Sequence, residues 1–364
     1  MSTRQPSAPL RFAAVVLVFL ALEALVFHTE LYPSILEPDS STGSLEYKIR
    51  NERVRVKNDR KQVLAVGHSR MALMPKVANE LQPATGYTFA TIGEPGATQR
   101  DWYYMLRNVD PDHNKYAAII VPSDDYDDVD GWEDLGDRPT DMFFLNARLE
   151  MRDLSEFPGS YTTPERQQAA FRAILFKGLA FQRDFQDFLT HPRERLKKVA
   201  MYRKDSAQWN YEYPGDPQTA EGLEIDWAAR QVIQYPPTWG PDLQQTSKNV
   251  LLAEPAPQTG RYTRYLLRWL GKIEQEYRGS GTKLIFIRLP RAPVINPTRP
   301  PFKADSAFRT LAKQPDTILS DEHLFDELER PALFKDPMHL NGPGSRRFTE
   351  ILARHVQAVL GGAH

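Results

Sequence analysis

The stretch VLAVGHSRMALMP, residues 63–75, decides how the rest of the chain is interpreted. It begins with a short apolar run, which ends at Gly67. A run of this kind is typical of a buried parallel strand. His68, Ser69 and Arg70 come next, followed by a pattern with helical spacing. Ser69 is therefore either a nucleophile held at the end of a strand or a polar residue that begins a helix.

Strand and helix patterns alternate through much of the chain. Apolar runs recur at residues 87–93, 116–122, 284–290 and 316–321, and the last amphipathic segment lies at 342–360. Three strand–helix units follow one another within about 70 residues, which predicts a mostly parallel sheet with helices on both faces. The expected fold class is therefore α/β with three layers.

The segment at about 131–258 interrupts this alternation. It contains a helical pattern after Thr163, a good N-cap residue followed by proline, and then loops rich in proline and tryptophan. We interpret it as a helical insertion over the sheet, not as a second domain with its own core. The predicted globular domain, insertion included, spans residues 61–364.

The N-terminus predicts a membrane anchor. Residues from Phe12 to Phe27 are apolar except Glu23, which approaches the length of about 20 residues that spans a hydrocarbon core. Basic residues precede this run and acidic residues follow it. The positive-inside rule then makes residues 1–11 a cytoplasmic tail and places the bulk of the chain outside. We expect a transmembrane anchor at 12–30.

Two alternatives to this anchor remain open. A cleaved signal peptide is disfavoured because no small-x-small cleavage site is obvious after the run. A buried helix of a soluble protein is the other alternative, and Glu23 counts against a lipid-facing helix unless it reaches the interface or meets a partner helix. Residues 31–60 are expected to be a connector. Its basic part is either a solvated segment or a contact with anionic lipid or polymer.

Composition excludes some classes of function. The net charge is −1, so no basic field points to nucleic acid. The chain has no cysteine, which excludes disulfides, thiolate catalysis and cysteine-based zinc sites. We expect no cofactor.

A candidate catalytic set comes from opposite ends of the predicted domain. Asp336 and His339 stand just before the closing helix, and a tight turn lets both side chains face one way. A serine hydroxyl needs a base, histidine is the usual base, and a carboxylate orients the histidine. Together with Ser69 they supply all three roles at the edge of the sheet where open α/β folds place their sites. Taken singly, they also fit a helix N-cap, a surface or packing histidine and a turn aspartate.

These motifs resemble those of the SGNH/GDSL hydrolase superfamily. The similar blocks are GHSR at 67–70, IGEPGAT at 92–98 and DPMHLN at 336–341. The first and last are similar to the membrane-anchored envelope branch, which includes proteins for alginate O-acetylation and teichoic-acid D-alanylation. The resemblance covers about residues 61–125 and 260–360. It implies an SGNH-like, flavodoxin-like domain.

The resemblance also implies roles for single residues. Ser69 is the nucleophile, His339 the base and Asp336 its partner. The backbone N–H groups of Ser69 and Gly96 form the oxyanion hole, and a donor of this kind contributes about 3 kcal/mol. Arg70 either anchors an anionic substrate group or braces the active-site loop.

The third family block departs from the pattern. Typical members have Gly-x-Asn-Asp after the third strand, whereas this chain has VPSDDYDD at 121–128, with Asp124 about where the asparagine belongs. An ionised carboxylate donates no hydrogen bond to an oxyanion. Asp124 is therefore turned away, protonated, in contact with substrate, or a sign of altered chemistry. The acidic run also fits a solvated loop or a calcium site, although it lacks the glycine and terminal glutamate of an EF-hand; we expect no metal.

The α/β-hydrolase fold is the nearest competitor. Its nucleophile elbow is Gly-x-Ser-x-Gly, but Met71 takes the second glycine position here. The serine also follows the first core strand, and Asp336 and His339 stand together near the C-terminus. Both features favour the SGNH arrangement.

The residues and the resemblance together predict a single-pass protein of the cytoplasmic (inner) membrane, with its catalytic domain on the periplasmic or extracellular side. The resemblance implies acyl-ester chemistry, namely O-acetyl transfer to, or removal from, a cell-envelope or exported polysaccharide. A membrane-bound acyltransferase is the expected protein partner. Because the third block is altered, the alternative is a catalytically inactive scaffold or polysaccharide-binding partner of such an acyltransferase.

Overall fold

Chain contacts divide the protein into two compact units. The structure, a computed structural model, describes residues 8–55, 60–123, 135–204, 219–252, 260–295 and 304–361. We name Met1–Asn51 with Gly136–Ser206 the helical unit, and Glu52–Leu135 with Ala207–His364 the sheet unit. Each unit has its own cluster of buried apolar side chains.

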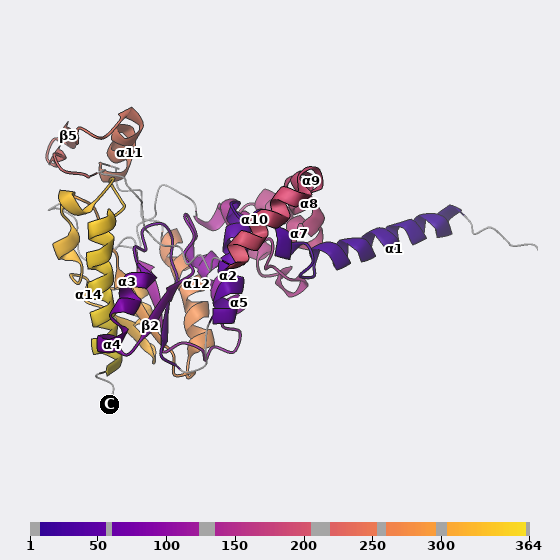
Figure 1. Cartoon of the computed structure of the whole chain (residues 1–364), viewed down its shortest axis with the longest axis horizontal. Helices are drawn as coiled ribbons and strands as arrows, with labels where there is room; N and C mark the ends of the chain where they lie inside the picture. Colours follow the sequence, from indigo (N-terminus) through magenta and orange to yellow (C-terminus); the bar gives the residue numbers. More distant parts are fainter. Residues whose placement is uncertain are drawn as a thin grey trace, which may run out of the picture. The chain divides into compact units, whose positions relative to one another are not determined.

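Five parallel strands form the centre of the sheet unit (Figure 1). They are β1 (Gln62–Ala65), β2 (Thr88–Thr91), β3 (Ala118–Ser123), β6 (Lys283–Arg288) and β7 (Thr317–Leu319). They lie in the order β2-β1-β3-β6-β7, and every pair is parallel. Counted along the chain, this is the order 2-1-3-4-5 of flavodoxin-like doubly wound sheets. The predicted α/β class with a mostly parallel sheet is confirmed.

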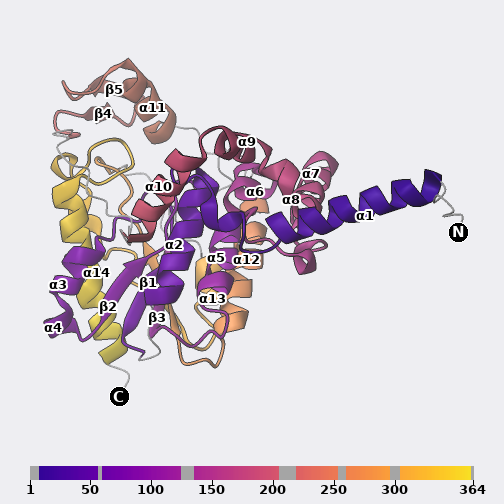
Figure 2. The ribbon, with the colours of Figure 1, turned by 45° about the vertical axis from the view of Figure 1, so that its right-hand side comes forward.

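Helices cover both faces of this sheet (Figure 2). One face carries α3 (Pro75–Glu80), α4 (Gln82–Thr85) and α14 (Gly342–Gly361). The other carries α5 (Gln99–Val109), α12 (Arg261–Tyr277) and α13 (Ala307–Leu311). Such two-sided cover explains why the strands are apolar on both faces.

Alternating side chains of the strands divide between the two layers. Val63, Phe89 and Ile285 lie in one cluster with Phe348 of α14. Phe286, the next residue of β6, contacts a ring of α13, with 5.3 Å between the centroids. Each strand therefore serves two apolar layers, as its unbroken apolar run predicts.

The chain leaves β1 without entering a helix at once. The sequence predicted helical spacing directly after Arg70, but α3 begins only at Pro75. Proline is favoured at the first helical position and disfavours helical geometry in the residue before it. Met74 accordingly has φ −100° and ψ 97°. Ser69 is therefore not the N-cap of this helix, which excludes one of its two interpretations.

The helical unit is built from distant segments. Its helices are α1 (Ala8–Phe27), most of α2 (Ser41–Arg55), α6 (Thr140–Leu145), α7 (Pro164–Leu175), α8 (Lys177–Ala180), α9 (Gln182–Thr190) and α10 (Pro192–Lys204). Its buried cluster contains Tyr32, Leu36 and Phe181, with Phe27, Phe185 and Phe188 packed against it.

The structure differs here from two expectations. The connector expected at 31–60 is largely the helix α2 and part of a packed unit. The insertion expected at 131–258 is divided, because its first half shares a core with the N-terminal segment. Its second half joins the sheet unit as β4 (Glu224–Asp226), β5 (Gln231–Gln234) and α11 (Pro241–Leu251). Periodicity within one segment does not reveal which distant segment covers its apolar side.

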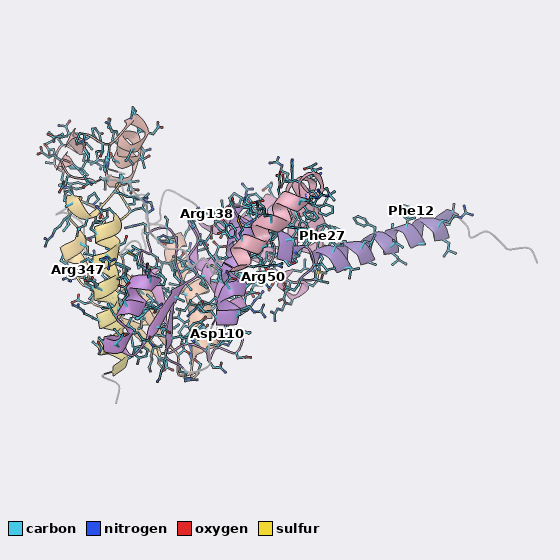
Figure 3. The ribbon with its side chains drawn as sticks, in the orientation of Figure 1. Phe12, Phe27, Arg50, Asp110, Arg138 and Arg347 are labelled. Atoms are coloured by element: carbon cyan, nitrogen blue, oxygen red, sulfur yellow. The ribbon has the colours of Figure 1, made fainter. Side chains whose placement is uncertain are left out.

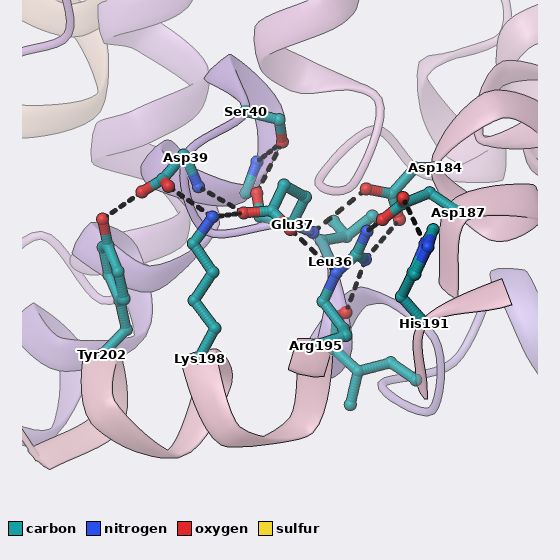
Figure 4. A network of polar contacts seen from close by, with 12 residues as sticks. Leu36, Glu37, Asp39, Ser40, Asp184, Asp187, His191, Arg195, Lys198 and Tyr202 are labelled. Carbon is teal, nitrogen blue, oxygen red and sulfur yellow. Dashed lines mark hydrogen bonds and ion pairs between the residues drawn. The ribbon is translucent and has the colours of Figure 1, made fainter. Parts of the chain in front are cut away.

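Arg195 of α10 gathers acidic side chains within the helical unit (Figure 4). Its guanidinium lies 2.9 Å from Glu37 and 3.0 Å from Asp184. Asp187 is a third partner at 2.6 Å, although the Arg195 side chain is only 1% exposed. Lys198, one turn further along α10, also pairs with Glu37. The network therefore fixes the chain after α1 to α9 and α10.

Replacing Arg195 with alanine should lower the free energy of unfolding of the helical unit by about 3 kcal/mol, because three neighbouring carboxylates lose a buried cation. Arg193→Ala, at an exposed position of the same helix, is the matched control and should stay within about 0.5 kcal/mol of wild type. Urea denaturation of the full chain in detergent, followed by circular dichroism, measures both. Equal stability of the two variants would contradict this role.

The helix α1 is long and apolar enough to cross a membrane, judged by length and composition. Its 20 residues correspond to about 30 Å, the thickness of a hydrocarbon core. Side chains are exposed along most of the helix between Phe12 and Phe27 (Figure 3). The predicted anchor at 12–30 thus corresponds to a suitable helix, while the crossing and its direction stay predictions.

Candidate active site

The strand β1 delivers Ser69 to the carboxyl edge of the sheet. The Val66 N–H donates to a carbonyl of β3 at 3.1 Å, so pairing continues just past β1. A Cβ at Gly67 would lie 2.6 Å from the Met71 Cβ, which leaves room only for glycine. The Met71 N–H bonds to the His68 carbonyl at 3.0 Å and closes a turn that contains Ser69.

His68 has a structural place in this turn. Its Nδ1 accepts a hydrogen bond from the Arg70 N–H at 3.1 Å. Its ring is buried and stacks on Trp102 of α5, with 6.0 Å between the centroids. The histidine beside the serine therefore stabilises the turn, and a base for Ser69 has to come from another segment.

Ser69, His339 and Asp336 form one hydrogen-bonded chain. His339 Nε2 lies 2.9 Å from Ser69 Oγ, and His339 Nδ1 lies 2.8 Å from Asp336 Oδ2. An ionised carboxylate only accepts hydrogen bonds, so Nδ1 carries the proton and Nε2 of the neutral ring accepts from the serine hydroxyl. This is the pattern in which histidine removes the proton of serine. The side chains of His339 and Asp336 are each 17% exposed, so the chain is shielded but accessible.

Backbone donors hold the carboxylate of Asp336 in place. Its Oδ1 accepts the N–H groups of Met338 and His339, each at 2.8 Å. Burial acts to raise the pKa of Asp336, but the hydrogen bond to His339, the electrostatic interaction with that ring and these two donors outweigh burial, and the pKa lies below its ordinary value. Asp336 is therefore ionised at neutral pH.

Asp336 should contribute stability with a definite pH dependence. Because its folded-state pKa is lowered, its contribution is fully present above the ordinary carboxyl pKa of about 4 and is lost as the pH falls through the folded-state value. The stability difference between wild type and Asp336→Asn should be constant from about pH 7 to about pH 5 and shrink below about pH 4. Urea titrations at each pH measure this difference. A difference that grows on acidification would argue against an ionised Asp336.

A short hairpin presents the aspartate and the histidine. Phe334 and Leu340 form an antiparallel bridge. Inside this bridge, the Lys335 N–H bonds to the His339 carbonyl at 3.0 Å. Asp336 and His339 thus lie on one tight loop, as their spacing predicted.

Asn341 links this hairpin to the start of α14. Its Oδ1 accepts the Gly344 N–H at 3.0 Å, and its Nδ2 donates to the Ala332 carbonyl at 2.7 Å. Asn341 ends the block DPMHLN, and the resemblance implied no role for it. Asparagine three positions before a helical N–H is nevertheless a standard helix start signal, which could have identified it.

Gly344→Ala should destabilise the sheet unit by about 2 kcal/mol, because a Cβ there would overlap the Leu333 carbonyl oxygen. That oxygen also accepts the Asn341 N–H at 2.9 Å, so ester hydrolysis should fall as well. Gly342→Ala is the matched control, since among the described residues nothing lies within 4 Å of the Cβ it would add. Thermal unfolding of both variants measures the effect. Equal melting temperatures would show that the overlap relaxes without cost.

Two buried residues outside the motifs also support the site. Thr349 of α14 accepts the Met74 N–H at 2.9 Å, and so connects α14 to the chain after the β1 turn. Trp239 donates from Nε1 to the carbonyl of Lys335, next to Asp336, at 3.3 Å. The partners are 275 and 96 positions apart, so no local signal in the sequence identifies these bonds.

Arg70 braces the turn from the other side. Its guanidinium donates to the carbonyls of Pro290 and Arg291, just beyond β6, at 2.8 and 3.1 Å. Arg291 is itself held by an ion pair of 2.6 Å to the buried Glu329. Of the two roles that the sequence left open for Arg70, this geometry supports bracing.

Gly96 lies in the loop after β2, which runs beside the start of the serine turn. The Glu94 N–H in this loop donates to the Gly67 carbonyl at 3.1 Å. Gly96 has a φ of +78°, a left-handed conformation that glycine adopts at low cost. The loop is thus placed near the segment before Ser69, while the oxyanion roles of the Ser69 and Gly96 N–H groups stay predictions.

Asp124 and the acidic residues after it lie outside the described residues. The candidate substrate contact and the calcium alternative at this position therefore stay predictions. Within the described ranges, no group of three or more His, Cys, Asp or Glu side chains is placed to hold a metal ion.

The site lies at the topological switch point of the sheet. The chain passes from β1 to β2 on one side and then crosses to β3 on the other. Ligands of doubly wound sheets bind outside the carboxyl ends of the strands where the order reverses in this way, and Ser69 follows β1 at that position. A scan against protein-family models finds none that matches this chain, and a search of curated protein sequences also finds no match.

Proposed function

We propose that this protein is a membrane-anchored serine esterase or acyltransferase of the SGNH type. One observation carries the proposal: Ser69, His339 and Asp336 are joined by hydrogen bonds of 2.9 and 2.8 Å at the carboxyl edge of a parallel sheet. The order of donors and acceptors is the one that activates a serine. The strand order and the motifs at 67–70 and 336–341 support the SGNH assignment.

The proposed reaction has two halves. Ser69 Oγ attacks the acyl carbon of an ester while His339 Nε2 takes the hydroxyl proton, and N–H donors stabilise the oxyanion. The leaving alcohol takes that proton from His339, which leaves an acyl-serine. His339 then takes a proton from water or a sugar hydroxyl as its oxygen attacks the acyl carbon. Ser69 regains a proton as the acyl group departs.

The proposed substrate is an O-acetyl ester, with a cell-envelope or exported polysaccharide as the acceptor or the acetylated molecule. This part rests on the resemblance to envelope acetylation proteins and on the apolar helix α1. The charges around α1 support an orientation with the N-terminus in the cytoplasm and the site on the other side of the inner membrane. A membrane-bound acyltransferase is the proposed source of acyl groups.

Product analysis tests the proposal and separates its two forms. The purified full chain is incubated with p-nitrophenyl acetate and an oligosaccharide, and sugars and acetate are analysed by mass spectrometry. Acetylated oligosaccharide supports transfer, whereas free acetate alone at every acceptor concentration leaves the esterase. If neither acetylated oligosaccharide nor free acetate forms, and Ser69→Ala retains its function in cells, both the transferase and the esterase are contradicted. That result would favour the inactive scaffold.

A further inference from the structure

Glu23, the one acidic residue of α1, has its hydrogen-bond partner within the helical unit. Its carboxylate accepts the Gly178 N–H of α8 at 2.8 Å, and its side chain is only 8% exposed. A Cβ at Gly178 would lie 2.5 Å from Glu23 Oε2 and 2.9 Å from the ring of Phe27. The helix α8 therefore packs directly against the last turns of α1.

The position of Glu23 along α1 determines the depth at which α8 lies relative to the bilayer. Glu23 lies about 6 Å before Phe27 along the helix axis. Leu22 and Leu25 on either side of it are more than half exposed, as expected of side chains that face lipid. If α1 spans a bilayer over its 20 residues, Glu23 and the α8 residues that contact it lie where hydrocarbon meets head groups.

In α8 the charged side chain is buried and an apolar side chain is exposed, which is the reverse of the pattern in a water-facing helix. Lys177 is buried, its Nζ donates to the Ala147 carbonyl at 3.1 Å, and burial lowers its pKa to about 8. Leu179 in the same short helix is 64% exposed. Leu31, just after α1, is 58% exposed. A carboxylate near hydrocarbon is costly unless it is hydrogen-bonded, and the Gly178 N–H supplies that bond.

We propose that α8 rests in the interfacial layer of the bilayer that α1 crosses, with Leu179 and Leu31 inserted among the lipid head groups. The partner is a lipid bilayer, because Leu31 follows the apolar helix α1 in the chain and Leu179 stands next to Gly178, which contacts Glu23 and Phe27 of that helix. The contact holds the helical unit against the membrane. The inference rests on the membrane anchor of the proposed function and not on its catalytic chemistry.

Single cysteine labels test this contact, since the chain has no cysteine of its own. Leu179→Cys, Leu25→Cys and Met201→Cys are each made in the full chain, labelled with a nitroxide and placed in phosphatidylcholine nanodiscs. Met201 is the control, because it is exposed near the end of α10 that points away from α1 (Figure 1). We expect the label at 179 to resemble the label at 25, with several-fold less exposure to a water-soluble nickel complex than the label at 201.

A label at 179 that is as accessible to nickel as the one at 201 would overturn the contact. If the label at 25 is also accessible, the anchor itself fails and the contact fails with it. Ester hydrolysis by the same labelled proteins reports separately on the catalytic site. Failure of the contact, of the anchor and of the enzyme are thus distinguishable.

A second pair of variants tests the coupling between α1 and α8. Gly178→Ala should separate the two helices and raise the nickel accessibility at Leu179, while the label at Leu25 stays shielded in the bilayer with α1. Gly159→Ala is the control, since among the described residues nothing lies within 4 Å of its added Cβ. Unchanged accessibility at Leu179 in Gly178→Ala would show that the depth of α8 in the bilayer does not depend on its packing against α1. The proposed coupling between the two helices would then be refuted.

Discussion

Ser69→Ala is expected to reduce hydrolysis of a chromogenic acetyl ester by about 10⁴-fold or more, with the fold unchanged. The substitution removes the oxygen that lies 2.9 Å from His339 Nε2 and would form the acyl bond. The turn also keeps contacts that do not involve this side chain, since Gly67 packs against Met71 and Arg70 bonds to backbone carbonyls. Initial rates of the full chain in detergent measure the effect, and circular dichroism checks the fold.

His339→Ala should cost about as much, and the double variant no more than either single one, because groups that act as a unit are not additive. The chain offers a matched control in His323. This exposed histidine lies 2.7 Å from Asp326 with the same three-residue separation as the candidate pair, but its partner is not a member of the candidate triad. His323→Ala should keep full activity. If the losses of the two single variants multiply in the double variant, Ser69 and His339 do not share a site. An equal loss of activity in His323→Ala would also refute the shared site.

Sequence and structure agree where the physics is local. Buried parallel strands are short apolar runs, and all five expected strands are present. Asp336 and His339 needed only one tight turn to meet. The contact between His339 and Ser69 spans 270 positions, yet it was predictable because carboxyl ends of parallel strands share one edge of the sheet.

The sequence was less informative where distant segments complete each other. The core of the helical unit joins Tyr32 to Phe181. The residue pattern of either segment gives no sign that the other segment packs against it. The same holds for Glu23, which the sequence marked as costly in lipid unless it met a partner helix. That helix, α8, comes from the same chain, and nothing in its four residues indicates that Glu23 is its partner.

The turn after β1 shows a different limit. Helical spacing after Arg70 suggested a helix that the chain does not form there, because Pro75 sets the start of α3. No role was predicted for His68, and in the structure its Nδ1 accepts the Arg70 N–H within the turn. Side-chain orientation in a turn depends on tertiary contacts that residue types alone do not record.

Asp336→Asn is expected to lower kcat/KM by about 10⁴-fold, the loss found for the same change in a serine-protease triad. In wild type the carboxylate at 2.8 Å requires a proton on His339 Nδ1 and leaves Nε2 free to accept from Ser69. An asparagine amide can donate to Nδ1 instead, which moves the ring proton to Nε2. The histidine then has no site for the serine proton.

The tautomer can be measured independently of activity by nitrogen NMR of His339 in the labelled full chain. We expect a protonated Nδ1 in wild type and a protonated Nε2 in Asp336→Asn. An inactive variant that keeps the Nδ1 proton would show that Asp336 acts through its charge on the imidazolium and not through the tautomer. An active variant would remove Asp336 from the mechanism. Since Met338 and His339 also donate backbone N–H groups to Asp336 Oδ1, unchanged chemical shifts of these two amides are the control that the loop has kept its shape.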